Sequence, residues 1–187
     1  MESYGLLLAA LLLVAAHLLG IRRQRQRIAL LSGYLQPYRI EALMAELIEG
    51  YLRALGATEE GRRDQIWAMM SGSEARLAAQ LQSLAGDLAG ASAATMRVGR
   101  ADLRKLIAVH ANGVRRAIDN SDGLDRRDQA YTLCAEMYLL QHSCHWYCRS
   151  RAVASARLLA RHKTSYAQVL AAVSDSTRDA YLALVGR

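Results

Sequence analysis

Cysteine and histidine side chains concentrate in one short segment of the chain, residues 141–148. On a helix, Cys144, His145 and Cys148 fall on one face, because residues three and four positions apart lie about one turn from each other. Thiolate and imidazole groups are ligands that zinc and copper prefer. The segment therefore offers up to three ligands for a transition metal.

A packed core is the alternative for the same segment. The spacing matches no zinc ribbon or knuckle, and a fourth ligand would have to come from the distant His110 or His162. Cysteine is among the most buried residue types, and the three cysteines of this chain need no bonding partner in a reducing cytoplasm. We therefore expect core cysteines beside a hydrogen-bonded histidine, with no metal and no cofactor. The metal candidates, if metal binds, are Cys144, His145 and Cys148.

Motifs of common enzymes are missing from the sequence. The chain has no Walker loop, no glycine-rich dinucleotide fingerprint, no HExxH and no GxSxG. The acidic run at residues 119–123 is similar to a calcium loop, but its glycine is misplaced and no glutamate closes it, so a turn is expected. We predict a protein that is not an enzyme.

An apolar stretch at the amino terminus, residues 4–20, is the most distinctive feature of the chain. As a helix it reaches about 25 Å, and the next two side chains bring it to the roughly 30 Å of a hydrocarbon core. A cleaved signal peptide would carry positive charge before the apolar run, whereas here the charge follows it. We predict a single transmembrane helix that is retained. The basic residues that follow are Arg22, Arg23, Arg25 and Arg27.

The same arginines predict an orientation, since basic residues next to a span stay on the cytoplasmic side. The amino terminus would face outward from a bacterial inner membrane. Pro37 should end the first helix, because proline removes a backbone donor and restricts the residue before it. The expected organisation is a transmembrane anchor and juxtamembrane helix over residues 1–36, followed by a cytoplasmic helical domain over residues 37–187.

Small residues within the apolar stretch fall on one side of the predicted helix, within about 60° of one another. They are Gly5, Ala9, Ala16 and Gly20. Small residues four positions apart let a second helix approach closely in lipid. The stripe therefore predicts a packing face for a second copy or for a partner's membrane helix. An Ala- and Leu-rich helix also produces such a stripe through composition alone.

Composition predicts an all-α bundle after the anchor. The chain has one proline and no phenylalanine, and its heavy use of Ala, Leu, Arg, Glu and Gln favours helix over strand. Apolar residues recur at spacings of three and four, which is typical of amphipathic helices. The expected helices cover residues 38–55, 58–70, 73–88, 98–118, 124–161 and 165–185, the last as one or two helices.

Charge is distributed unevenly along a chain whose formal net charge is +7. The net charge is +4 over residues 1–40, −4 over residues 41–96 and +7 over residues 97–187. A basic face near a bilayer can bind anionic lipid, nucleic acid or an acidic partner, or it can simply be a solvated helix face. A basic surface is predicted from Arg149, Arg151, Arg157, Arg161 and Lys163.

Together these features favour a non-catalytic accessory, assembly or scaffold subunit of a larger bacterial membrane complex. Its partners would be membrane proteins of that complex, or a second copy, bound through the anchor helix. The alternative is a membrane-tethered binding module whose basic helices recruit nucleic acid or anionic lipid. A third hypothesis is a metal- or redox-binding helical protein built on Cys144, His145 and Cys148.

The metal question has a direct test. We expect the purified protein to contain no stoichiometric transition metal and to melt at the same temperature with and without a chelator. Cys148→Ala should then cost only packing, about 1 kcal/mol for a small buried group. Elemental analysis and thermal melts check this. About one zinc or copper per chain, lost in the variant, would contradict it.

Overall fold

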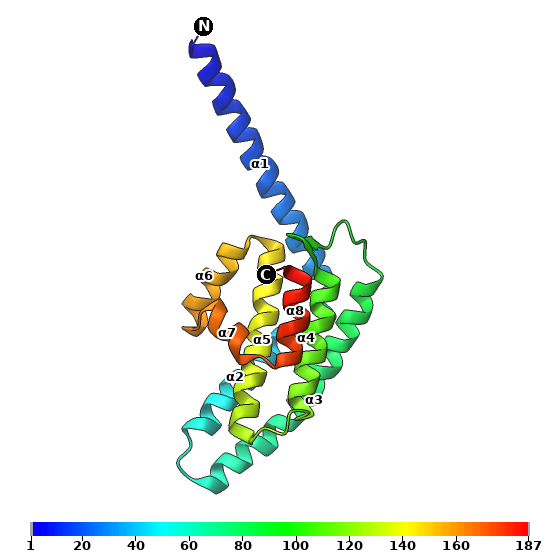
Figure 1. The fold of residues 1–187 in the computed structure, drawn as a ribbon, viewed down its shortest axis with the longest axis vertical. Coiled ribbons are helices and arrows are strands. Elements are labelled where there is room, and N and C mark those ends of the chain that lie inside the picture. Colours follow the sequence, from blue (N-terminus) through cyan, green and yellow to red (C-terminus); the bar gives the residue numbers. More distant parts are fainter. Residues whose placement is uncertain (1, 187) are drawn as a thin grey trace.

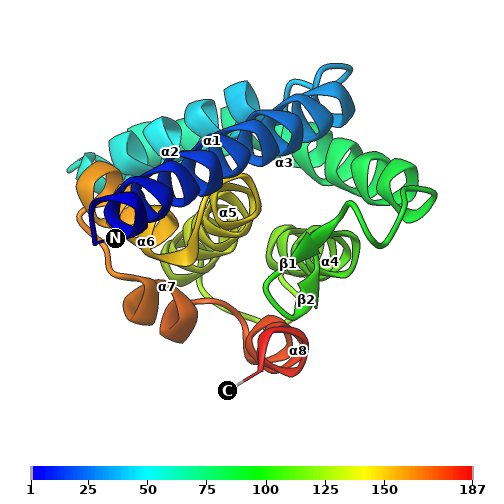
Figure 2. The ribbon, with the colours of Figure 1, turned by 90° about the horizontal axis from the view of Figure 1, so that it is seen from above.

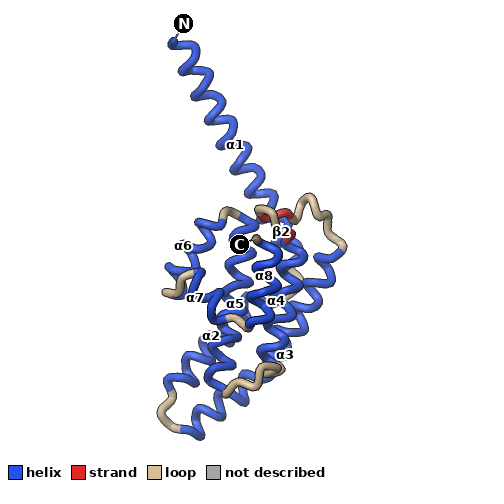
Figure 3. The backbone as a smooth tube through the Cα atoms, in the orientation of Figure 1, coloured by secondary structure: helices blue, strands red, loops and turns tan. Residues whose placement is uncertain are grey.

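Helices make up nearly all of the regular structure (Figure 3). The computed structural model describes residues 2–186 and, among them, the side chains of residue 5 and residues 8–186. The elements, in chain order (Figure 1), are α1 Glu2–Leu35, α2 Ile40–Gly56, α3 Glu60–Ala89, β1 Arg97–Val98, β2 Ala101–Asp102, α4 Leu103–Ile118, α5 Arg126–Cys148, α6 Arg151–His162, α7 Tyr166–Ala172 and α8 Asp175–Val185. The predicted all-helical class is confirmed.

α1 consists of a projecting half and a packed half. Its amino-terminal half extends away from the bundle (Figure 1), and residues 8–20 are all exposed. The packed half brings Leu31 into the core and ends at Leu35, just before the predicted stop at Pro37. Within the part of the chain that the structure describes, no helix combines the length and apolar content needed to cross a membrane. The predicted helix is confirmed, and its role as a span stays a prediction.

α5 is the central helix of the bundle. It packs against α1, α2, α4, α6 and α7, and seen from above it lies between α1 and α7 with α4 beside it (Figure 2). Its buried side chains include neighbours such as Ala135, Glu136 and Met137, which point in different directions around the helix. A helix buried on most of its circumference is the core element on which the others are arranged.

α3 corrects one expected boundary. Ser71, Gly72 and Ser73 predict a break, yet α3 runs through them without interruption. The Ser71 hydroxyl donates to the Ala68 carbonyl at 2.8 Å, and the Ser73 hydroxyl donates to Glu46 Oε1 on α2 at 2.6 Å. Both hydroxyls find partners while the backbone stays helical, so no turn is needed.

The long helix expected over residues 124–161 is also wrong, because it is divided into α5 and α6. Arg149 leaves the helical conformation, and the Ser150 hydroxyl accepts from the Val153 backbone N–H at 3.2 Å. A serine in this position caps a new helix. The resulting bend lets α6 fold away from the axis of α5 and contact α7.

The helix expected from residue 98 begins later, at Leu103. Asp102 caps α4 by accepting from the Arg104 backbone N–H at 3.0 Å, and β1 and β2 form a short antiparallel hairpin before it. Gly99 makes the hairpin turn with φ of +59°, where the Trp146 ring would lie 3.0 Å from an added Cβ. Glycine is required there by both the backbone angle and the close approach.

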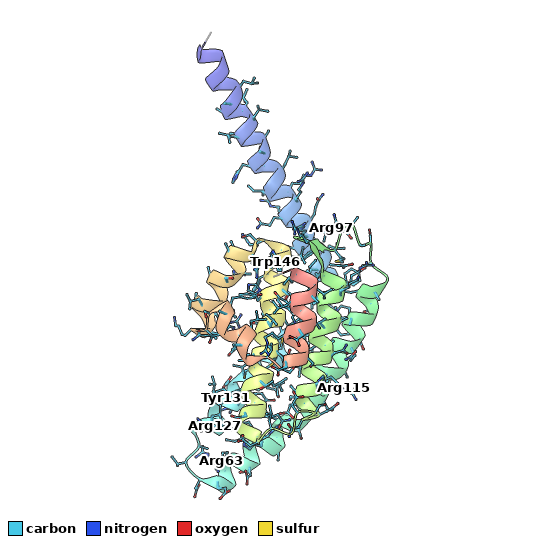
Figure 4. The ribbon with its side chains drawn as sticks, viewed as in Figure 1. Arg63, Arg97, Arg115, Arg127, Tyr131 and Trp146 are labelled. Atoms are coloured by element: carbon cyan, nitrogen blue, oxygen red, sulfur yellow. The ribbon has the colours of Figure 1, made fainter. Side chains whose placement is uncertain are left out.

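One arginine fixes α1 to the bundle. Arg27 donates to the carbonyl of Tyr147 at 3.2 Å and to the carbonyl of Arg97 at 3.1 Å, and its guanidinium lies 5.3 Å from the Tyr147 ring centroid. Arg97 and Trp146 mark this end of the bundle, from which α1 projects (Figure 4). Of the four arginines in the predicted basic cluster, Arg27 therefore has a structural role. The other three are exposed.

Candidate functional site

A pocket of about 700 Å³ lies at the base of the projecting helix, where α1, α2, α5 and α6 meet. Its volume is in the range typical of small-molecule sites. The packed half of α1 and the start of α2 supply the apolar wall. The apolar residues of the wall are Ile28, Leu31, Leu35, Ile40 and Ala42.

Three arginines from separate elements line the same pocket. Arg39 lies in the loop before α2, Arg149 follows α5, and Arg157 is on α6. All three side chains are exposed, and none forms an ion pair with another described residue. Glu41 is the acidic residue among the lining side chains. The pocket therefore combines an apolar wall with an excess of positive charge.

The predicted Cys/His segment forms another part of this pocket. Cys144, His145 and Cys148 all line it, so the structure brings the three metal candidates together on one face of α5. Burial raises the pKa of the Cys144 thiol to about 12 and also raises that of Cys148. Burial is likewise the main cause of the lowered pKa of His145. The raised pKa values favour the protonated thiols, which are poorer nucleophiles than thiolates.

The described residues contain no group of three or more histidine, cysteine or acidic side chains arranged to hold a metal ion. The fourth-ligand candidates are engaged elsewhere. His110 Nε2 lies 2.8 Å from Ser143 Oγ, and His162 Nε2 lies 3.1 Å from Gln141 Oε1. All three cysteines are free and partly buried. All three pack against the hydrophobic core, and Cys144 and Cys148 also line the pocket.

The predicted basic surface is exposed at all five positions, Arg149, Arg151, Arg157, Arg161 and Lys163. These side chains do not act as one set. Arg151 lies 5.3 Å from the Trp146 ring centroid and 5.0 Å from the Tyr166 ring centroid, and it donates to the Tyr166 hydroxyl at 3.1 Å. It is therefore engaged in holding α7 against α5, whereas Arg149 and Arg157 face the pocket.

The predicted small-residue stripe lies entirely on the projecting half of α1. Gly5, Ala9, Ala16 and Gly20 are exposed, and nothing lies within 4 Å of a Cβ added at Gly5 or Gly20. This face is open to a second helix. The stripe and the pocket are separated along α1 by the exposed arginines at residues 22–25.

A buried polar network between α4, α5 and α8 was missed by the sequence analysis. His110 and Ser143 are paired in the core, and Glu136 is fully buried. Glu136 Oε1 accepts from the Ser174 backbone N–H at 3.2 Å and from the Ser174 hydroxyl at 3.0 Å. Ser174 in turn caps α8 by accepting from the Thr177 backbone N–H. The carboxyl of Glu136 thus holds the start of α8.

This network contains a serine, a histidine and an acid, but not in a catalytic arrangement. The Glu136 carboxyl binds Ser174, and His110 Nδ1 has no hydrogen-bond partner. Ser143 is completely buried, so a substrate cannot reach its hydroxyl. A signal was present in the sequence, because Glu136 lies between Leu133 and Leu140 on a face spaced for the core.

Close packing around Glu136 makes its carboxyl group a weaker acid than usual. A Cβ added at Gly113 on α4 would collide with the Glu136 carboxyl and the Thr177 hydroxyl, so the absence of a side chain there makes the room for both. Burial raises the pKa of Glu136 to about 7, and the hydrogen bonds from Ser174 oppose that rise. Burial lowers the pKa of His110 to about 3. The folded state therefore favours the neutral form of both groups.

Glu136→Gln should change how stability depends on pH. Because the folded pKa of about 7 exceeds the ordinary value of 4.5, the favourable neutral carboxyl is present below pH 4.5 and is lost as pH rises through 7. Glutamine stays neutral. We expect the variant and the parent to unfold with similar free energies near pH 4.5, and the variant to be more stable by up to about 3 kcal/mol at pH 8.

Denaturant unfolding at the two pH values measures the difference, with the exposed Glu49→Gln on α2 as control. The buried histidines also change stability with pH, but they are common to all three proteins and cancel in the comparison. A stability difference that does not depend on pH would contradict the raised pKa.

Comparisons of the chain with known proteins identify no relative. The chain matches no family model, no curated protein sequence and no solved structure. The function proposed for this chain therefore depends on its own residues, and above all on the projecting helix and the pocket at its base.

Proposed function

We propose that this protein is a membrane-anchored, non-catalytic accessory or scaffold subunit, which holds a helical bundle at the cytoplasmic face of a bacterial inner membrane beside a larger complex. One observation carries the proposal. The projecting half of α1 exposes large apolar side chains to an extent that water disfavours, from 55% for Leu19 to 72% for Leu13. Contiguous apolar surface of this kind marks a membrane or protein contact.

The distribution of these side chains favours a bilayer as the surroundings. At about 100° per residue, Leu11, Leu12, Leu13 and Val14 point to different sides of the helix. All four are exposed by more than half. A partner protein would cover one side of a helix, whereas lipid surrounds every side, and a helix that is apolar all round is suited to lipid.

Exposed arginines mark the boundary of the apolar half. Arg22, Arg23 and Arg25 follow it directly and point into solvent, and the bundle begins at Arg27. Basic residues at this position favour the cytoplasmic side and interact with anionic headgroups. The bundle would then sit against the membrane surface, with the base of α1 at the headgroups.

The scaffold role is supported by the open small-residue stripe on the projecting helix. Gly5, Ala9, Ala16 and Gly20 leave one face of α1 free for close packing. A membrane helix of a partner, or of a second copy, fits such a face. The bundle itself is fixed to α1 through Arg27, so a partner that binds the anchor would position the whole bundle.

A second candidate is the membrane-tethered binding module. The observation that favours it is the set of exposed arginines without ion-pair partners among the described residues, Arg39, Arg149 and Arg157. Salt-sensitive binding of a polyanion would distinguish it from the scaffold.

The anchor is tested by membrane fractionation. We expect the full chain to stay with the membrane pellet after carbonate extraction, and a reporter fused to the carboxy terminus to be cytoplasmic. Replacing Leu11, Leu12 and Leu13 with glutamate should release the protein, because each charge opposes burial in hydrocarbon by about 2.5–3.5 kcal/mol. A full chain found in the soluble fraction, or a secreted protein from which the cell has cleaved the first twenty residues as a signal peptide, would contradict the proposal.

The packing face is tested by changing its shape without changing its hydropathy class. Gly5→Ile combined with Ala16→Ile should weaken association in membranes roughly tenfold, since branched side chains keep helices apart. Ala10→Ile with Ala15→Ile is the matched control on other sides of α1. Crosslinking and co-purification of partners measure association. Equal association of both double variants would show that the stripe has no role.

A further inference from the structure

The pocket at the base of α1 has two chemically different parts. Its apolar wall comes from Ile28, Leu31, Leu35 and Ile40, on the inner side of α1 and the first turn of α2. Leu31 and Ile40 also belong to the core, so this wall is fixed by packing. A preformed apolar wall stabilises a bound hydrocarbon segment without much rearrangement of the protein.

Its polar part is built for an anion. Arg39, Arg149 and Arg157 approach the pocket from a loop, the end of α5 and α6. Guanidinium groups bind phosphate oxygens with paired hydrogen bonds, and three of them outnumber the one carboxylate, Glu41. The pocket is thus suited to a ligand with an apolar tail and an anionic head.

The position of the pocket next to the proposed membrane anchor indicates that such a ligand would come from the bilayer. The pocket lies beside Ile28, one turn after the exposed arginines that follow the apolar half of α1. If that half is in the bilayer, Ile28 of the pocket lining lies about 10 Å along α1 from Ile21, within reach of the headgroup layer. We propose that the pocket binds one anionic phospholipid, with its phosphate among the three arginines and part of one acyl chain against the apolar wall.

This inference rests on the proposed membrane anchoring and names the ligand that the same region would take. The pocket is smaller than a whole two-tailed phospholipid, so the remainder of the lipid stays in the bilayer. A bound lipid would contact both α1 and the bundle, because both line the pocket. Binding would therefore help to fix the orientation of the bundle relative to α1 at the membrane surface.

The test uses the full chain in a neutral detergent, titrated with dioctanoyl phosphatidylglycerol. Native mass spectrometry counts bound lipid. Alkylation of Cys148, which lines the pocket, reports occupancy, and Cys134, which does not line it, is the internal control. We expect one lipid per chain and slower alkylation of the two pocket cysteines, Cys144 and Cys148, with the alkylation of Cys134 unchanged. Dioctanoyl phosphatidylcholine and glycerol 3-phosphate test the head and the tail separately, and each should bind roughly tenfold more weakly.

Two pairs of variants locate the site. Ala42→Phe places an aromatic ring in the pocket, whereas Ala45→Phe adds the same ring to an exposed position of α2 outside it. Arg39→Gln with Arg157→Gln removes two arginines of the pocket, and Arg53→Gln with Arg62→Gln removes the same charge elsewhere. The pocket variants should lose affinity about tenfold and the controls less than about twofold.

Helical content and melting temperature confirm that each variant is folded, and the arginine pair keeps the test valid if the phenylalanine destabilises α2. Equal affinity of the pocket variants and their controls would overturn the proposal. Binding of glycerol 3-phosphate as tight as that of dioctanoyl phosphatidylglycerol would also overturn it. Membrane fractionation of the same variants is measured separately. A parent chain that is fully retained in membranes but binds no lipid defeats this inference alone, and loss of retention in the parent chain defeats the anchor.

Discussion

Burial of α5 on most of its circumference is the constraint on which the rest of this structure depends. Because the helix has so little solvent-facing surface, each buried polar side chain that it carries needs a partner on a neighbouring element. Ser143 pairs with His110 on α4, Glu136 with Ser174 at the start of α8, and His142 with Ser155 on α6. These pairs set the positions of three surrounding helices relative to α5.

The carboxy-terminal end of the same helix joins the core to the candidate site. The Tyr147 carbonyl accepts from Arg27, which fixes α1, and the Tyr147 hydroxyl donates to the Thr95 carbonyl before the hairpin. On the adjoining face, Cys144 and Cys148 line the pocket. The carboxy-terminal end of α5 therefore contacts α1 through Tyr147 and also forms part of the pocket at the base of α1. This links the proposed anchor to the proposed lipid site.

The two classes of buried ionisable group have opposite consequences for pH. Glu136 is favoured as the neutral acid, so its contribution falls as pH rises, and His110 is favoured as the neutral base, so its contribution falls as pH decreases. Both shifts arise from desolvation in a closely packed interior. In both cases the packing that buries the group also favours its neutral form.

The sequence by itself determined the helical class, the end of α1 before Pro37 and the exposed basic residues, because proline geometry and local apolar spacing act over a few residues. It did not determine the continuity of α3 through Ser71–Ser73 or the division at Ser150. In α3 the Ser73 hydroxyl donates to Glu46 on α2, whereas the Ser150 hydroxyl accepts from the Val153 backbone and caps a new helix. Cys144 and His145 were identified as a cluster, yet their place beside Arg39, Arg157 and the apolar wall of α1 came only from the fold. Side chains this distant in sequence meet through tertiary packing, which no local pattern encodes.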